Sequence, residues 1–313
     1  MEAAVVCIMD DLKLIKPEKD TTFALLLEAQ KRGLDVLYAN ETDLALAGGE
    51  CMARLRRIRL FDDPEHWFEV DSETTRALGR GDLVLMRCDP PVDDGYIYAT
   101  MMLDRAEARG ARIVNRPNAL RNFNEKLSIA RFPELTPATR VATDPASLRE
   151  FVGKHERAVV KPLDGMGGRG IFMVGKDDPN VNVILETLTG DGTRPAMAQE
   201  FLPGIAEGDK RILMVHGQPV PYVLARIPGG SDFRGNLARG GRGKGMPIND
   251  DELRIAHTVG PVLVDNGIEF AGLDVIDGRL TEINVTSPTC VRELDAQFGI
   301  NISGMLFDAL GRQ

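Results

Sequence analysis

Residues 161–172 read KPLDGMGGRGIF, and this segment decides the fold class. A lysine ends one predicted strand, glycines follow, and a second strand is predicted from about residue 170. Gly165, Gly167 and Gly170 fit the pattern G-x-G-x-x-G, but a dinucleotide site needs a helix after the glycines, and here a strand follows. A glycine loop beside an ammonium group can instead close over phosphates with its backbone N–H groups. We therefore predict a triphosphate-binding loop; a plain flexible turn is the alternative.

The chain around this loop predicts antiparallel α+β structure from about residue 123 onward. Short predicted strands alternate with glycine-rich connections, and they cover residues 157–163, 170–174, 196–202 and, as a hairpin pair, 210–227. The long glycine-rich stretch at residues 227–245 contains seven glycines. A loop of this length is usually functional or disordered.

Residues before about 123 predict a separate α/β unit. Its predicted strands cover residues 3–9, 35–39, 82–87 and 112–115, and its predicted helices run from about residue 20 to Gly33 and from about residue 95 to Gly110. This alternation is typical of a parallel sheet. The turn after the first strand, DDLKLIKPEKD, lacks the glycines that a pyrophosphate requires, so we expect substrate contacts here and no dinucleotide site.

Residues 271–289 read AGLDVIDGRLTEINVTSPT and predict two strands around an Asp-Gly turn. Glu282 and Asn284 are two residues apart, so they project from the same face of a strand. The apolar residues of both strands share one face only if residue 274 pairs with residue 282, which needs an odd loop or a β-bulge in place of a two-residue turn. Asp274 then lies beside Glu282 and Asn284, and these oxygen ligands suit Mg²⁺. A hairpin with a polar solvent-facing side is the alternative.

Composition and length exclude several classes of protein. The chain has 313 residues, which suggests two or three packed units, and its net charge of -9 argues against a nucleic-acid-binding surface. Cys7, Cys51, Cys88 and Cys290 are scattered, so neither disulfides nor a structural zinc is indicated. The first apolar run has only about seven residues, too short for a signal peptide or a membrane span. We therefore expect a cytoplasmic protein with no membrane contact.

The ordered set of motifs resembles the ATP-grasp ligases and, among them, the prokaryotic glutathione synthetase family. The resemblance covers essentially the whole chain and is carried by FALLLEAQKRG (23–33), VLMRCDPPVDDGYIYAT (84–100), NEKL (124–127), KPLDGMGG (161–168), GDKRIL (208–213), LARIP (224–228), RGNLARGGRG (234–243) and LTEINVTSPT (280–289). It implies a Rossmann-like (pre-ATP-grasp) α/β domain at residues 1–122, followed by a two-lobed α+β ATP-grasp fold. The expected central lobe is 123–202 and the expected C-terminal lobe is 203–313.

The resemblance also implies roles for individual residues. The expected ATP-binding residues are Lys126, Lys161, Gly165, Gly167, Gly168, Gln199, Glu200, Leu202 and Asp209. The stretch from Gln199 to Leu202 is expected to hold adenine through its backbone, and Asp209 is expected to reach the ribose. The implied metal positions are Asp274, Glu282 and Asn284, for Mg²⁺ with Mn²⁺ as an alternative ion. The implied catalytic residues are Arg211, Arg226, Arg234 and Arg239, the first two facing the reacting carboxylate and phosphoryl group.

The reaction of this family joins γ-glutamylcysteine to glycine with ATP, through an acyl phosphate. Phosphorylating a carboxylate brings two anions together, so cations must lie near the transferring oxygens and water must be excluded. The stretch 227–245, with Arg234, Arg239, Arg242 and Lys244, has the composition of a lid that closes over anions; a disordered basic linker is the alternative. The resemblance further implies an assembly of identical subunits, a tetramer.

Other functions remain open at this stage. Another ATP-grasp ligase, which joins two D-amino acids or adds glutamate to a peptide, would differ only in the substrate-side residues within 84–100. A non-catalytic nucleotide-binding protein would have no use for a metal site and a basic lid. P-loop NTPases and protein kinases are disfavoured because their motifs do not occur, and an oxidoreductase is disfavoured by the missing glycine turn.

Overall fold

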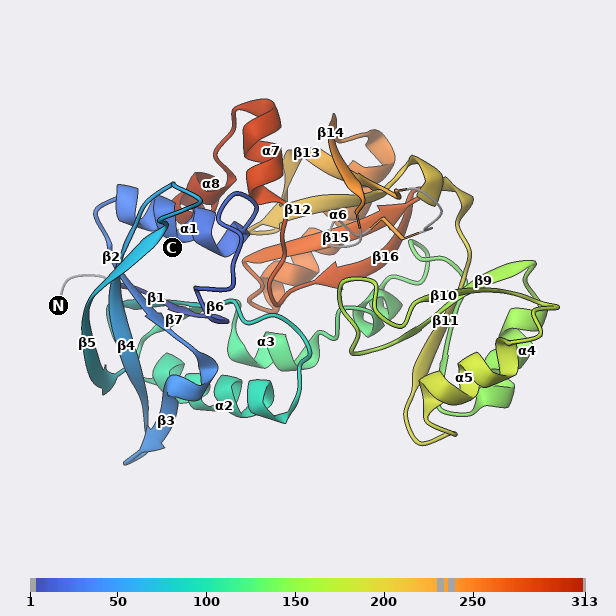
Figure 1. Cartoon of the computed structure of the whole chain (residues 1–313), viewed down its shortest axis with the longest axis horizontal. Helices are drawn as coiled ribbons and strands as arrows, with labels where there is room; N and C mark the ends of the chain where they lie inside the picture. The colour runs from blue at the N-terminus through green and yellow to red at the C-terminus, as the bar shows by residue number, and fades with distance from the viewer. Residues whose placement is uncertain (1–3, 230–233, 236–239, 312–313) are drawn as a thin grey trace.

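The computed structural model describes residues 4–229, 234–235 and 240–311. Within these residues the chain forms a seven-stranded, a four-stranded and a five-stranded β-sheet. The five-stranded sheet, from the last part of the chain, lies between the other two (Figure 1). The first part contains β1 (Ala4–Ile8), α1 (Thr21–Lys31), β2 (Asp35–Ala39), η1 (Glu41–Asp43), β3 (Leu44–Ala47), β4 (Glu50–Leu60), β5 (Phe68–Ala77), β6 (Asp82–Met86), α2 (Asp94–Ala108), β7 (Arg112–Val114) and α3 (Pro117–Asn122).

The parallel strands predicted for the first sheet are confirmed. Strand β1 pairs in parallel with β2 and β6, and β6 pairs in parallel with β7. All five residues of β1 are buried, as expected of a central strand between layers. Helix α1 begins after Asp20, whose side chain accepts a hydrogen bond of 2.6 Å from the backbone N–H of Phe23.

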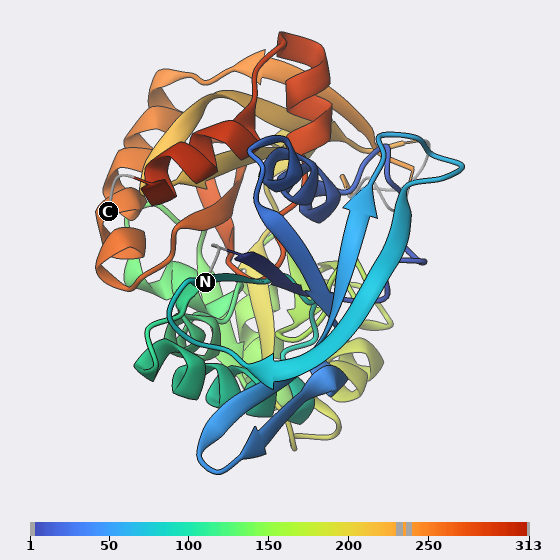
Figure 2. The same ribbon diagram turned by 90° about the vertical axis from the view of Figure 1, so that its left-hand side faces the viewer.

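The sequence did not predict β3, β4 and β5, which extend the parallel strands in antiparallel fashion. Strands β4 and β5 form a long curved pair at the edge of the sheet (Figure 2). Buried Asp43 ties η1 to β4 through ion pairs with Arg54 at 2.5 Å and Arg56 at 2.7 Å. Strand β5 is exposed over most of its length, so its sequence lacks the alternating hydrophobic pattern from which a strand is predicted.

The middle of the chain forms the lobe at the right of Figure 1. Its elements are η2 (Leu127–Arg131), β8 (Thr139–Ala142), α4 (Pro145–Gly153), β9 (Arg157–Pro162), β10 (Phe172–Gly175), α5 (Val181–Thr189) and β11 (Ala196–Glu200). The strands pair in the order β10-β9-β11-β8, all antiparallel, which confirms the predicted antiparallel structure. Apolar side chains of α4 and α5 pack on this sheet and form a separate core.

The last part contains η3 (Pro203–Glu207), β12 (Asp209–Val215), β13 (Gln218–Ile227), β14 (Arg242–Pro247), α6 (Asp250–Asp265), β15 (Phe270–Ile276), β16 (Arg279–Asn284), α7 (Val291–Phe298) and α8 (Ile302–Gly311). Its strands pair in the order β14-β13-β12-β15-β16. Helices α7 and α8 pack against α1, so the end of the chain joins the first sheet to the third. None of the described helices is long and apolar enough to cross a membrane. All four cysteines are buried free thiols.

The predicted loop at 227–245 is shorter than expected. Residues from Arg242 onward belong to β14, where Arg242 pairs with Ile227 and Lys244 with Ala225. The sequence of β14, RGKGMP, has no alternating apolar residues, so it does not predict a strand. The strand is held by its backbone pairing with β13. Residues 230–233 and 236–239 lie outside the described chain.

The predicted register of the last hairpin is confirmed, since Asp274 pairs with Glu282. The turn nevertheless keeps two residues, Asp277 and Gly278, both with positive φ as in a type I′ turn. The register shift comes from a bulge, because Val275 pairs with Leu280 and leaves residue 281 without a partner.

Asn115 joins the first sheet to the third. Its buried side-chain N–H group donates to the carbonyl oxygens of Phe270 and Val285, both at 2.7 Å. Its side-chain oxygen accepts from the backbone N–H groups of Glu269 at 2.8 Å and Phe270 at 3.0 Å. One side chain therefore satisfies backbone groups at the start of β15 and just after β16.

We expect Asn115→Ala to lower the free energy of unfolding by about 3 kcal/mol, because it leaves several buried backbone groups without partners. Urea unfolding followed by far-UV circular dichroism measures this loss. Asn122→Ala, at the exposed end of α3, is the matched control and should change the value by less than about 0.5 kcal/mol. Equal losses in both variants would contradict a structural role for Asn115.

Candidate active site

The cleft between the second and third sheets contains two adjoining cavities. The first cavity is lined by Pro137, Val159, Lys161, Ile171, Gln199, Glu200, Phe201, Leu202, Ile205, Asp209, Arg234, Gly235, Asp274, Ile276, Thr281 and Glu282. The second cavity, of about 210 Å³, is lined by Asp89, Pro90, Glu125, Lys126, Gly165, Met166, Gly167, Gly168, Ile171, Arg211, Arg226, Asp274, Glu282, Asn284, Thr286, Ser287, Thr289 and Cys290. The cleft thus collects nearly all of the site residues expected from sequence.

Asp274 is the centre of a buried charge cluster. Its carboxylate accepts hydrogen bonds from Nε of Arg211 at 2.5 Å and Nη2 of Arg211 at 2.9 Å, and it forms an ion pair of 2.9 Å with Arg226. The amide nitrogen of Asn284 donates to the same carboxylate at 3.2 Å. Burial by itself would raise the pKa of Asp274, but the two guanidinium charges outweigh it and hold this pKa well below its ordinary value. The carboxylate is therefore ionised at neutral pH.

Asp209 shares Arg226 with Asp274. One carboxylate oxygen of Asp209 accepts from Nη2 of Arg226 at 2.5 Å. Its other oxygen, Oδ1, is buried and has no hydrogen-bond partner among the described residues. Burial raises the pKa of Asp209 to about 6, although Arg226 acts in the opposite direction. An unpartnered acceptor that lines the first cavity could be satisfied by a hydroxyl group of a ligand.

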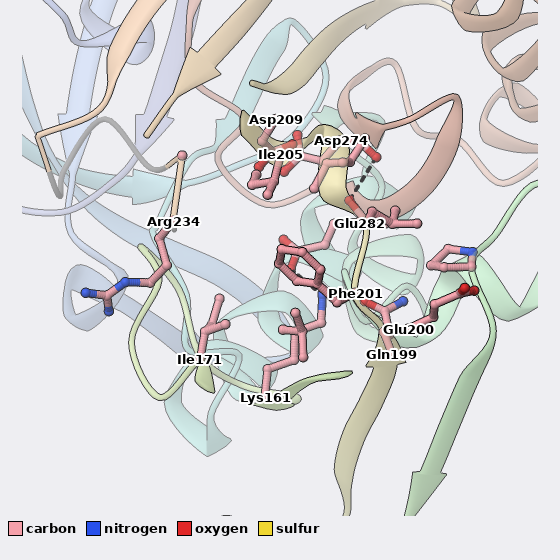
Figure 3. Close-up of a pocket in the computed structure, with 16 residues that line it drawn as sticks. Lys161, Ile171, Gln199, Glu200, Phe201, Ile205, Asp209, Arg234, Asp274 and Glu282 are labelled. Carbon is pink, nitrogen blue, oxygen red and sulfur yellow. Dashed lines mark hydrogen bonds and ion pairs between the residues drawn. The ribbon is translucent and has the colours of Figure 1, made fainter. Parts of the chain in front are cut away.

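The side chains of two buried lysines, Lys126 and Lys161, lie beside Glu282 and the glycine loop. Nζ of Lys161 lies 3.2 Å from Oε1 of Glu282, and Nζ of Lys126 lies 3.8 Å from the same oxygen. Lys126 also donates to the carbonyl oxygen of Gly165 at 2.6 Å. Burial favours the neutral form of Glu282, but the two lysines outweigh it and hold the pKa of this carboxyl below its ordinary value. Figure 3 shows the side chain of Lys161, on strand β9, extending toward Glu282.

The glycine loop requires its glycines. Gly167 and Gly168 have positive φ values of 60° and 76°, and a Cβ at Gly165 would lie 2.9 Å from a ring carbon of Pro162. Nη1 of Arg234 donates to the carbonyl oxygen of Gly168 at 2.7 Å. The segment after β13 therefore contacts the glycine loop. Arg239 lies outside the described residues.

The end of β11 forms one wall of the first cavity, where Gln199, Glu200 and Leu202 all lie as expected. The side chain of Gln199 is buried and donates to Oγ1 of Thr139 at 3.2 Å. Sequence inspection did not single out the apolar wall residues, such as Val159 and Ile276. Nothing in their local sequence separates them from other apolar strand residues.

The expected metal ligands are brought together on one face of the last hairpin. Within the described residues, no three His, Cys, Asp or Glu side chains are grouped so that they could hold a metal ion. The expected ligands therefore number three only when the amide of Asn284 is counted with the carboxylates of Asp274 and Glu282. The amide nitrogen of Asn284 makes both of its hydrogen bonds, which keeps its oxygen available. This donor set of two carboxylates and an amide oxygen fits a hard cation.

Comparisons with known proteins identify the family. Two family models match in succession: the N-terminal domain of prokaryotic glutathione synthetase at residues 3–121 and its ATP-grasp domain at residues 125–299. The chain belongs to the prokaryotic glutathione synthetase family. Glutathione synthetase from Xanthomonas campestris pv. campestris is 53% identical over 310 residues, which cover 99% of this chain and 98% of that protein. The Photorhabdus laumondii enzyme of the same name is 54% identical, with 97% and 96% covered.

A solved structure shares the fold. The ATP-grasp ligase PsnB, complexed with a phosphomimetic variant of its minimal precursor, Mg and ADP, superposes with a TM-score of 0.63 at 18% identity and covers 99% of this chain and 98% of that one. The predicted fold class and the predicted ATP-dependent ligase activity are thereby confirmed. The roles expected of individual residues stay predictions.

We expect Asp274→Asn to lower the free energy of unfolding by about 3 kcal/mol, because it leaves two buried guanidinium groups without their shared counter-charge. Urea unfolding in the absence of nucleotide measures the effect. Asp277→Asn, on the exposed turn of the same hairpin, should change the value by less than about 0.5 kcal/mol. A loss in Asp274→Asn no larger than in this control would mean that the cluster adds nothing to stability.

Proposed function

We propose that this chain joins γ-glutamylcysteine to glycine and converts ATP to ADP and phosphate, with glutathione as the product. The observation that carries the proposal is the pairing of buried cations with carboxylates in one cleft: Arg211 and Arg226 on Asp274, and Lys126 and Lys161 on Glu282. Such a cluster suits a reaction that brings anionic phosphate and carboxylate groups together. The names of the curated relatives support the choice of substrates.

ATP is assigned to the first cavity and to the glycine loop. In this arrangement Gln199, Glu200 and Leu202 border the adenine, and the unpartnered Oδ1 of Asp209 accepts a ribose hydroxyl. Lys126 and Lys161 lie where the phosphate chain meets the backbone N–H groups of Gly165, Gly167 and Gly168. Buried ammonium groups in a cleft shielded from water stabilise phosphate charge more strongly than exposed ones.

Asp274, Glu282 and Asn284 would hold Mg²⁺, with Mn²⁺ as an alternative. The bound ion would neutralise phosphate charge and orient the transferring group. The Mg and ADP named for the structurally similar ligase PsnB support this assignment. Because Asp274 is bonded to both arginines, its carboxylate would serve the metal and the guanidinium groups together.

The reaction follows from these positions. The cysteine carboxylate of γ-glutamylcysteine attacks the γ-phosphoryl group, the bond between the γ-phosphorus and the bridging oxygen breaks, and ADP leaves as the acyl phosphate forms. Arg211 and Arg226 stabilise the charge on both partners. The amine of glycine then attacks the acyl carbon, and phosphate leaves. The segment between β13 and β14, with Arg234 and Arg239, acts as the lid that keeps water from the acyl phosphate. The contact between Arg234 and Gly168 supports this role.

We also propose three domains, at residues 1–122, 123–202 and 203–313, because each range contains one sheet. Assembly into a homotetramer is proposed from the family resemblance. A cytoplasmic location is consistent with consumption of ATP and with four free thiols.

An ADP-release assay with each substrate omitted in turn tests the function. We expect rapid ADP release only when γ-glutamylcysteine and glycine are both present, because the acyl phosphate is shielded from water until the amine arrives. Mass spectrometry should find one tripeptide for each ADP. Release that does not depend on glycine, or that yields no tripeptide, would refute the proposal.

The metal assignment predicts that Glu282→Gln raises the Mg²⁺ concentration for half-maximal activity by at least about 10-fold. The same variant should bind Mn²⁺ more weakly in the presence of ADP, which electron paramagnetic resonance measures without turnover. Glu207→Gln, an exposed residue outside both cavities, is the control. Unchanged magnesium and manganese titrations would remove Glu282 from the ligand set.

A further inference from the structure

The carboxylates of the second cavity fall into two groups. Asp274 and Glu282 are each paired with two cations, as described above. Asp89 and Glu125 also line this cavity, but neither forms an ion pair with any residue that the structure describes. The cavity therefore has a part beside the glycine loop whose carboxylates form ion pairs, and a part whose carboxylates form none with the described residues. A ligand that fills it needs a positive group of its own.

Asp89 is held in place for such a ligand. It lies three residues beyond the carboxyl end of β6, the edge of a parallel sheet where ligands bind, and it is exposed. Its backbone N–H donates to Oδ2 of Asp10 at 2.9 Å, and Ser287 lines the same cavity. Its anchor thus comes from the segment that follows β1.

Arg87 fixes the loop that carries Ser287. This arginine is buried, with 6% of its surface exposed. Burial lowers the pKa of Arg87, and the nearby carboxylates of Asp20 and Asp89 act in the opposite direction. Its guanidinium donates to the carbonyl oxygen of Pro288 at 2.9 Å and to Oγ1 of Thr22 at 3.0 Å. The backbone that follows Ser287 is therefore held by Arg87.

Glu125 has different surroundings. Oγ1 of Thr286 donates to its carboxylate at 2.8 Å, and its backbone carbonyl accepts from Ile283 at 2.8 Å. Its neighbour in the chain is Lys126, which contacts the glycine loop and Glu282. Glu125 thus lies beside Lys126, whereas Asp89 is held by Asp10.

We propose that Asp89 binds the α-ammonium group of the γ-glutamyl residue and so selects dipeptides with a free amino group. The inference rests on the proposed function. In γ-glutamylcysteine the reacting carboxylate belongs to cysteine, and the α-ammonium lies at the opposite end of the molecule. Asp89 lines the same cavity as Arg211 and Arg226, so it offers an acceptor to the ammonium of a dipeptide whose reacting carboxylate lies at the two arginines. An ammonium donates up to three hydrogen bonds and matches such an acceptor.

Glutarylcysteine tests this assignment, because it is the same dipeptide without the α-amino group. We expect the wild-type enzyme to use γ-glutamylcysteine with a kcat/KM about 10- to 100-fold above that for glutarylcysteine. In Asp89→Asn this ratio should fall to about 3 or less, through loss of activity on γ-glutamylcysteine alone. The KM for ATP should stay within about twofold of wild type.

Glu125→Gln is the matched control, since it removes the other unpaired carboxylate of the cavity. It should retain most of the preference for the free amino group. A ratio that collapses in Glu125→Gln and persists in Asp89→Asn would overturn the assignment, and so would equal losses on both dipeptides in Asp89→Asn. A wild-type enzyme that forms both products equally well would refute recognition of the ammonium, whereas one that forms no tripeptide would refute the proposed function itself.

Discussion

The site depends on the buried carboxylate of Asp274, which forms ion pairs with arginines of two neighbouring strands. Asp274 on β15 faces Arg211 on β12 in the strand register, and Arg226 on β13 faces Asp209 on β12. Burying these charges is costly unless each has a partner at close range, so the order β13-β12-β15 is a condition for the cluster. Gly272 contributes by its size, since a Cβ there would lie 2.6 Å from the side chain of Arg211.

The N-terminal sheet takes part in the site although it contributes none of these charges. Asn115 holds the start of β15 and the chain after β16, while Arg87 holds the loop that follows. Both residues lie just beyond the carboxyl ends of parallel strands, and both use side chains to satisfy backbone groups of the third sheet. The hairpin that carries Asp274 and Glu282 is thus held by side chains that follow strands of the first sheet. The positions of Asp274 and Glu282 therefore depend on this junction.

The parts of the structure that follow from local pattern were predictable from sequence. The hairpin register of Asp274 and Glu282 followed from strand alternation, because one register alone buries the apolar side chains together. Strand β5 was not predicted because it is exposed, and β14 was not predicted because its sequence, RGKGMP, lacks alternating apolar residues. The pairing of Arg226 with Asp209 and Asp274 depends on sheet order, which no local pattern encodes. Asp89 could not be singled out from sequence, because only folding places it beside Asp10 and in one cavity with Arg211 and Arg226.

The buried cysteines have a consequence for an enzyme whose proposed product is itself a thiol. Thiol–disulfide exchange needs a thiolate that the attacking sulfur can reach. Burial shields Cys7, Cys51 and Cys88, and it raises the pKa of Cys51 to about 11, which leaves almost no thiolate at neutral pH. Cys290 lines the second cavity but has no exposed surface. Mixed disulfides between the folded chain and oxidised product are therefore disfavoured. Synthesis can continue while the cellular pool of the product becomes oxidised, which is when replacement of the reduced thiol matters most.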